Sequence, residues 1–144
     1  EFYISGDAFV KDWIIKVRND VPDAPVLVTA GGLLHYFEEN KVISLLRMIG
    51  QSGNMEVVFD TVNKKGMAMM QKKYMKQVGH ADAQMFFYVD AAKELAAKIR
   101  GNVKVIAEEP YYRYIPKNGL KLSTKVSMAV SDQFKMVKMI HLKL

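Results

Sequence analysis

The sequence predicts an α/β fold built on one mostly parallel sheet that ends in an antiparallel terminal hairpin. First, the run Pro25–Thr29 is apolar or β-branched without polar alternation, as in a strand covered by helices on both faces. Second, apolar residues recur at helical spacing both before and after this run. Third, the chain closes with Ile140, Leu142 and Leu144 alternating with polar His141 and Lys143, which is the period of a half-buried strand.

The composition predicts one globular domain, residues 1–144, in a reducing cytoplasm. Half of the 144 residues are hydrophobic, which is enough for one core and too little for two domains of ordinary size. No apolar run approaches the ~20 residues of a membrane span, and no charged-then-apolar leader opens the chain, so a membrane is not an expected partner. The sequence contains no cysteine, which excludes disulfides and thiolate chemistry.

Charge is distributed unevenly along the chain. Residues 1–62 carry 5 basic and 9 acidic side chains, whereas residues 63–144 carry 16 and 6. Such asymmetry can mark a surface for nucleic acid or for an acidic substrate. Because the lysines of the rear part are dispersed, without an arginine–aromatic cluster or a nucleic-acid motif, a solvated face is the favoured interpretation.

The front of the chain predicts a strand followed by a helix. The strand covers Phe2–Ser5 and is closed by Gly6 and Asp7. The helix is indicated by apolar residues on one face, at Val10, Trp13, Ile14 and Val17. Asp7 has two interpretations, as the N-cap of this helix or as a carboxylate that meets a ligand at the end of a strand.

The residues that follow Pro25–Thr29 form the candidate site. Ala30, Gly31 and Gly32 allow either a sharp turn or a close approach of a ligand to the backbone. A second buried strand, Met55–Phe59, is followed by Asp60 and Thr61, which we expect at the same edge of the sheet.

Four further elements complete the predicted fold. A helix with acidic Glu38 and Glu39 at its start ends at Gly50, and a second helix runs from an N-cap at Asp90 to Gly101. Val103–Ala107 predicts a strand, and Leu122, Val126, Ala129 and Val130 predict one more helix before the last strand, which starts near Phe134. Between residues 63 and 88 the apolar positions are mostly methionines, and Met67, Met70, Tyr74 and Val78 share a helical face that is either plain core or a cover for an organic substrate.

Most catalytic motifs are absent from the sequence. His35, His80 and His141 are far apart, and none lies at metal-ligand spacing from a carboxylate, so no metal site is expected. The chain has no G-x-S-x-G elbow, no phosphate-cradling loop and no G-x-G-x-x-G. What it offers instead is a set of strand ends on one edge of one sheet.

Two segments carry a resemblance to a known family. VLVTAGGLLHYFEENKV, followed by VVFDTV, resembles the V-L-x-x-A-E-G-L-L-x-Y-F segment and the later V-F-D-T of class I S-adenosylmethionine-dependent O-methyltransferases of the tetracenomycin type, relatives of leucine carboxyl methyltransferase. ISGDAFVKDWI, MFFYVDAAKELAAKI and VKVIAEEPYYRY resemble other parts of that pattern, so the similarity extends over the whole chain.

The resemblance implies a Rossmann-like methyltransferase sheet, S-adenosylmethionine as cofactor and a small-molecule acceptor. It implies a cofactor-binding set, Gly6, Asp7, Ala8, Phe9, Ala30 and Gly31, with Asp7 and its neighbours at the adenine, and it implies that Tyr36 and Asp60 face the acceptor. Together with His35, these two residues are the candidate catalytic residues. A carboxylate acceptor needs no deprotonation, whereas a hydroxyl needs a base, for which His35 or Asp60 is the candidate. Gly31 stands where the family has glutamate, and His35 stands at a variable position.

The whole chain resembles only the C-terminal part of the methyltransferase fold. The family's strand order is 3-2-1-4-5-7-6, and its first strand, with the glycine-rich loop, has no counterpart in this chain. With Phe2–Ser5 as strand 3 and Val26–Thr29 as strand 4, a gap of ~14 Å would separate them. We therefore expect the front to be another chain, to have been removed, or to be replaced by strand pairing with a second copy, and we expect this chain alone to be inactive.

A hypothesis from another class is a non-catalytic, methyltransferase-like interaction module. It would bind an acidic partner or nucleic acid through the basic rear part, and Gly31 in place of glutamate favours it. A different nucleotide-binding α/β domain is a third hypothesis, which the missing phosphate loop disfavours.

Overall fold

The computed structural model describes residues 3–77 and 84–144. Four strands form its sheet: β1 (Val26–Ala30), β2 (Met55–Val62), β3 (Lys104–Pro110) and β4 (Val137–Lys143). The helices are α1 (Asp12–Asp20), the 3-10 turn η1 (Leu34–Tyr36), α2 (Glu39–Gly50), α3 (Lys64–Gln77), α4 (Ala92–Ile99) and α5 (Leu122–Gln133).

The strand order is β1-β2-β4-β3, with β1 parallel to β2 and β4 antiparallel to both of its neighbours. This arrangement equals the 4-5-7-6 part of the order expected from the sequence. The α/β fold class and the antiparallel terminal pair of strands are therefore confirmed. The sheet is mixed rather than mostly parallel as predicted, since among the described strands β1 and β2 form one parallel pair and the other two pairs are antiparallel. One side of β1 carries no strand among the described residues, so β1 is an edge of the sheet.

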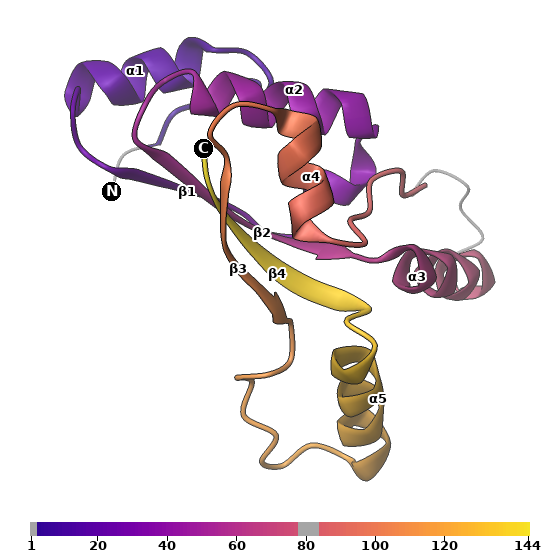
Figure 1. Ribbon diagram of the computed structural model, residues 1–144. Helices are drawn as coiled ribbons and strands as arrows, with labels where there is room; N and C mark the ends of the chain where they lie inside the picture. The colour runs from indigo at the N-terminus through magenta and orange to yellow at the C-terminus, as the bar shows by residue number, and fades with distance from the viewer. Residues whose placement is uncertain (1–2, 78–83) are drawn as a thin grey trace.

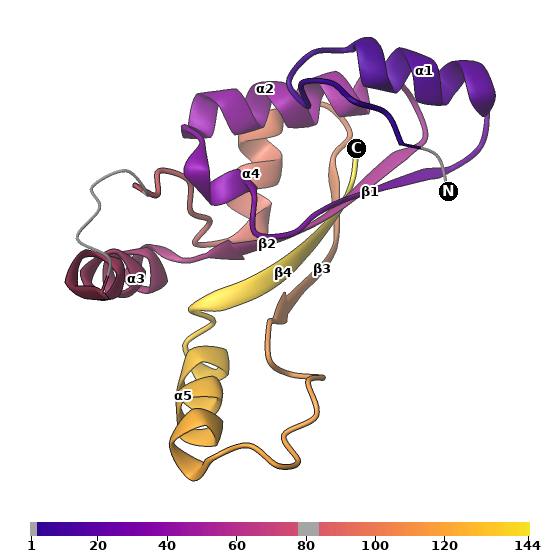
Figure 2. The same ribbon diagram turned by 180° about the vertical axis from the view of Figure 1, so that it is seen from behind.

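The helices that the structure describes cover one face of the sheet. Figures 1 and 2 show α1, α2 and α4 together on that face, with α3 beyond the end of β2 and α5 beyond the ends of β3 and β4. On the opposite face Leu27 is 57% exposed and Ile106 is 51% exposed. The prediction that helices cover the central strand on both faces was therefore wrong for this chain, since its second face has no cover among the described residues.

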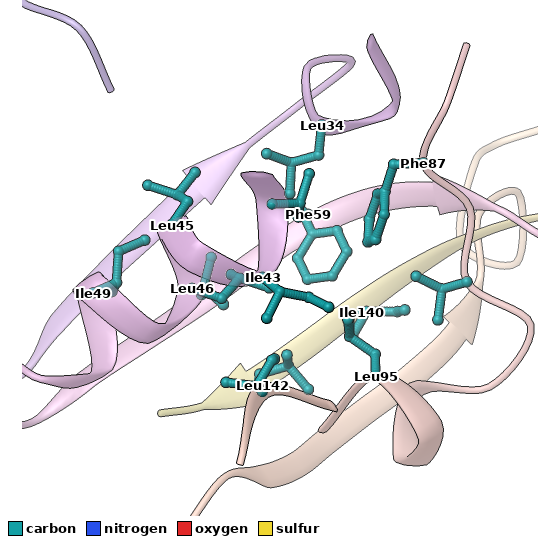
Figure 3. Close-up of a cluster of buried hydrophobic side chains, with 14 of the residues drawn as sticks. Leu34, Ile43, Leu45, Leu46, Ile49, Phe59, Phe87, Leu95, Ile140 and Leu142 are labelled. Carbon is teal, nitrogen blue, oxygen red and sulfur yellow. The ribbon is translucent and has the colours of Figure 1, made fainter. Parts of the chain in front are cut away.

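The core lies between the sheet and these helices. Helix α2 places Val42, Leu45, Leu46 and Ile49 in the core, as its helical spacing predicts. Figure 3 shows Phe59 of β2 beside Phe87, whose ring centroid lies 6.5 Å away, with Ile140 of β4 close by. A smaller cluster of Val62, Met67 and Met85 packs where β2 meets α3.

The front segment departs from its prediction. Tyr3, Ile4 and Ser5 are not part of a strand, while Phe2 lies outside the described residues. The expected gap between two separated strands therefore does not exist. Helix α1 begins at Asp12, so Asp7 does not cap it; the Asp7 carboxylate instead accepts a hydrogen bond from Phe9 N at 2.9 Å.

Asp90 was also predicted to be an N-cap and is not one. Its carboxylate accepts a hydrogen bond from Lys64 N at the start of α3, 2.9 Å away, rather than from α4. At the start of α4, Ala92 N donates to the carboxylate of Glu108 on β3. Lys138 Nζ donates both to Glu108 Oε1 and to the main-chain oxygen of Asp90, each at 2.7 Å, and its side chain is only 1% exposed.

The methionine-rich middle and the last helix are found close to where they were predicted. Helix α3 buries Met67 and half-buries Met70, whereas Met69 is exposed. Val78, another residue of the predicted apolar face, lies outside the described residues. Helix α5 was predicted from apolar spacing that usually marks a buried face, but Leu122, Val126 and Val130 are exposed.

Candidate functional site

The candidate site lies at the edge of the sheet where β1 and β2 end. The carboxylate of Asp60 accepts a hydrogen bond from Gly32 N at 2.6 Å, which ties the loop after β1 to the neighbouring strand. Asp60 and Thr61 belong to β2 itself rather than following it as expected. Two of the three predicted strand ends, those of β1 and β2, therefore lie next to one another.

An apolar pocket of about 280 Å³ lies beside β1 at this edge. Three predicted cofactor-binding residues, Gly6, Ala8 and Ala30, line it although more than twenty residues of sequence separate Ala8 from Ala30. The remaining walls come from apolar side chains, of which Trp13, Leu33 and Leu34 were not predicted as site residues. Both leucines belong to the family-like segment; Leu34 is buried, whereas Leu33 is 39% exposed.

Asp7, Phe9 and Gly31, the other predicted cofactor-binding residues, lie around this pocket rather than in it. Asp7 lines a smaller neighbouring cavity together with Gly6 and Trp13. Phe9 packs edge-on against Phe37, with ring centroids 4.5 Å apart, and Lys41 Nζ lies 4.3 Å from the Phe9 centroid. A side chain at Gly31 would meet nothing within 4 Å, so the glutamate of the family pattern has room there.

His35 and Tyr36 stand on η1, directly after the glycine loop. The His35 side chain is buried, and burial lowers the pKa of its imidazole, while the Asp60 carboxylate acts in the opposite direction. Its main-chain oxygen accepts hydrogen bonds from Phe86 N at 2.8 Å and Phe87 N at 3.3 Å, which fixes the turn. The Tyr36 ring is 42% exposed and lies 4.3 Å from the imidazole, centroid to centroid.

The three predicted acceptor-side residues thus share one end of the sheet, with a neutral imidazole close to a carboxylate. Because burial lowers the pKa of the imidazole, the uncharged form of His35, which has one ring nitrogen without a proton, is favoured. Phe86, which is 44% exposed beside this turn, was not predicted as a site residue and carries no sequence signal that could have identified it.

The other histidines lie elsewhere. His141 on β4 pairs with Glu56 at 2.8 Å on the open face of the sheet, and His80 lies outside the described residues. Within residues 3–77 and 84–144, no group of three or more histidine and acidic side chains is arranged to hold a metal ion. Over the same two ranges, no helix combines the length and the apolar character required to cross a bilayer.

Comparison with known proteins gives a likeness of fold. No family model and no curated protein sequence matches this chain. Among solved structures, a DUF574 family protein from Streptomyces avermitilis superposes with a TM-score of 0.63 at 10% sequence identity, over 98% of this chain and 54% of that chain. This chain therefore has the α/β fold of one part of that protein and spans about half of its length.

Proposed function

We propose that this chain contributes the rear part of an S-adenosylmethionine-dependent O-methyltransferase. The observation that carries the proposal is the convergence of Gly6, Ala8 and Ala30 on one apolar pocket, one strand away from Asp60. Ligands of open α/β sheets bind outside the carboxyl ends of the parallel strands, and this pocket reaches that end of β1 at Thr29 and Ala30. The strand order β1-β2-β4-β3 supports the same assignment.

The pocket suits the adenosyl part of the cofactor. Small residues at positions 6, 8 and 30 leave room for a flat ring, and Trp13 and Leu33 supply apolar walls. When bound, the cofactor supplies a methyl group on a sulfonium for in-line displacement by an acceptor oxygen. The residues of this chain would hold the adenosyl group and orient the acceptor, so their contribution is mainly proximity and orientation.

The acceptor would lie on the side of His35, Tyr36 and Asp60. A carboxylate acceptor is already ionised at neutral pH and needs no base. For a hydroxyl acceptor, the uncharged imidazole of His35 would take the proton, and the Asp60 carboxylate would stabilise the imidazolium that forms. Tyr36, with its exposed ring, would form one wall of the acceptor pocket.

The open edge of β1 indicates how the cofactor site would be completed. A parallel strand with a glycine-rich loop, added alongside β1, would bring backbone N–H groups to the cofactor from the other side of the pocket. That strand would come from the front part of the same fold or from a second copy of the chain. We expect the chain with β1 unpaired to bind the cofactor weakly and to be inactive.

Calorimetry with S-adenosylhomocysteine tests the proposal on the longest natural form of the protein. We expect binding that is lost in Ala8→Trp, because the new ring fills the pocket from an exposed loop position. The control Ile15→Trp places the same ring on an exposed position of α1 and should leave affinity unchanged. Absence of binding at millimolar ligand would show that the cofactor assignment is wrong.

A second candidate function is the non-catalytic interaction module. It is favoured by Gly31, which replaces the glutamate of the family pattern although the space around it would admit a side chain. This function predicts salt-dependent retention on a nucleic-acid or acidic matrix that a charge-matched control protein does not show. Methyl transfer by the natural full-length protein would exclude it.

A further inference from the structure

Helix α5 carries a row of exposed apolar side chains that no described residue covers. The row is formed by Leu122, Val126, Val130 and Phe134, which are 77%, 54%, 44% and 56% exposed. Their spacing of four places them along one side of the helix, and Phe134 N donates to Val130 O at 3.1 Å, which carries the helical geometry on to the last member. Met128 and Ser131, on the other side of the helix, are buried.

The shape of this row fits another helix better than a lipid surface. Residues spaced by four form one of the ridges along which helices pack into each other's grooves. Along one border the row is kept narrow by Ser123 and Ser127. Helices that lie in a membrane interface present a broad apolar face with large side chains instead.

The charge around the row favours an acidic partner. Residues 111–136 carry five basic side chains and one acidic one. In an antiparallel pairing of two α5 helices centred on Met128, Lys121 just before the helix of one copy and Lys135 just after the helix of the other would come to the same end of the pair, and both are exposed. Like charges at a helix–helix contact are unfavourable, so a second copy of this chain is disfavoured as the occupant.

The place of α5 in the fold separates this surface from the candidate cofactor pocket. Helix α5 connects β3 to β4, and among the described elements its main contacts are with these two strands. The pocket lies at β1, on the far side of β2 in the strand order. A partner seated on α5 would therefore leave the open edge of β1 accessible.

We propose that α5 is a docking surface for an amphipathic helix of another protein, one whose apolar residues are spaced by three or four and flanked by acidic side chains. The apolar row would supply the buried centre of the contact, and Lys121 and Lys125 would pair with carboxylates along its border. This surface does not depend on the proposed methyl transfer, since neither the pocket nor His35 takes part in it.

Two synthetic helical peptides test the proposal, each about 16 residues long with leucines at positions spaced by three and four. One carries glutamates on the flanks of the leucine stripe and the other carries lysines. We expect the acidic peptide to bind the protein at least about tenfold more tightly than the basic one, with an affinity that falls as ionic strength rises. Val126→Asp should abolish binding, whereas Ile15→Asp, which changes a similarly exposed residue of α1, should not.

The charge-reversed double variant Lys121→Glu with Lys125→Glu checks the electrostatic part without touching the apolar row. It should reverse the preference between the two peptides, and circular dichroism should show an unchanged fold. Equal affinity for both peptides would overturn the proposal. It would also be overturned if Val126→Asp removed binding to phosphatidylglycerol vesicles but not to the peptide, or if it converted a dimer into a monomer in sedimentation.

Discussion

The buried ion pair between Lys138 and Glu108 is the sharpest stability test that the fold offers. Lys138 lies on the core side of β4, in phase with Ile140 and Leu142, and its ammonium bridges Glu108 to the main-chain oxygen of Asp90. Replacing it by methionine keeps most of the buried volume and removes both hydrogen bonds. The Glu108 carboxylate then loses its cation and keeps only the bond from Ala92 N.

The expected loss of stability follows from the Glu108 carboxylate, which the substitution leaves without its cation. Removing one partner of a buried pair costs about 3–5 kcal/mol, because the remaining charge stays desolvated. The Glu108 side chain is 22% exposed and so retains some water, which places Lys138→Met at the lower end, about 3 kcal/mol. The control Lys98→Met breaks the surface pair with Glu39, whose side chains are 52% and 43% exposed, and should cost less than about 1 kcal/mol.

Urea denaturation followed by circular dichroism measures both variants. Burial acts to raise the pKa of Glu108, but the hydrogen bonds from Lys138 and Ala92 outweigh it and lower the pKa below the usual 4.5. The pair therefore stabilises the fold above pH 4.5, and this contribution is lost as the pH falls through the lowered pKa. In Lys138→Met the free energy of unfolding should therefore change less with pH below 4.5. The pair would not stabilise the fold if Lys138→Met lowered the free energy of unfolding no more than Lys98→Met, or if it left the pH dependence below 4.5 unchanged.

Three further perturbations have defined outcomes. Gly66→Ala should destabilise the protein although alanine normally favours a helix by about 1 kcal/mol, because the new Cβ would collide with the main-chain oxygen of Met136; a rise in melting temperature would contradict this. Burial lowers the pKa of His35 below 6.5, so the unfolded chain binds more protons and stability should fall as the pH drops below 6.5; His35→Gln should remove this slope from urea midpoints measured between pH 7 and 5. Arg18→Lys should cost about 2 kcal/mol, because lysine cannot reproduce bonds to Ser52 O and Ala24 O at once, whereas Lys16→Ala on the same helix should be nearly neutral in the same assay.

The spacing of apolar residues correctly predicted those helices and strands that bury one regular face in the core. Helix α2 follows its apolar spacing to Gly50, and β4 alternates as expected. The predicted strand at Tyr3–Ser5 does not form, because residues of high β-propensity form a strand only when another strand pairs with them. No described strand pairs with the outer side of β1. The burial of Lys138 could have been recognised, since the period of two places it on the same side as Ile140.

The positions of the candidate residues at the ends of β1 and β2 were predicted, but their contacts were not. A strand followed by small residues marks the edge of the sheet where Ala30 and Asp60 lie. The roles of the aspartates could not be predicted, because Asp90 bonds to Lys64 N, 26 residues away, instead of to its own helix. Likewise the exposure of Val126 depends on how far α5 extends beyond the sheet, which spacing along the helix does not encode.

The guanidinium of Arg18 joins the turn before β1 to the turn before β2, at the end of the sheet opposite the candidate site. At the site itself, side chains added at Gly6 or Gly31 would enter open space. The Arg18 hydrogen bonds that hold the two turns together therefore lie at the opposite end of the sheet from the candidate site. Substitutions at the two glycines would therefore change the surroundings of the pocket without disturbing the turns that Arg18 holds together.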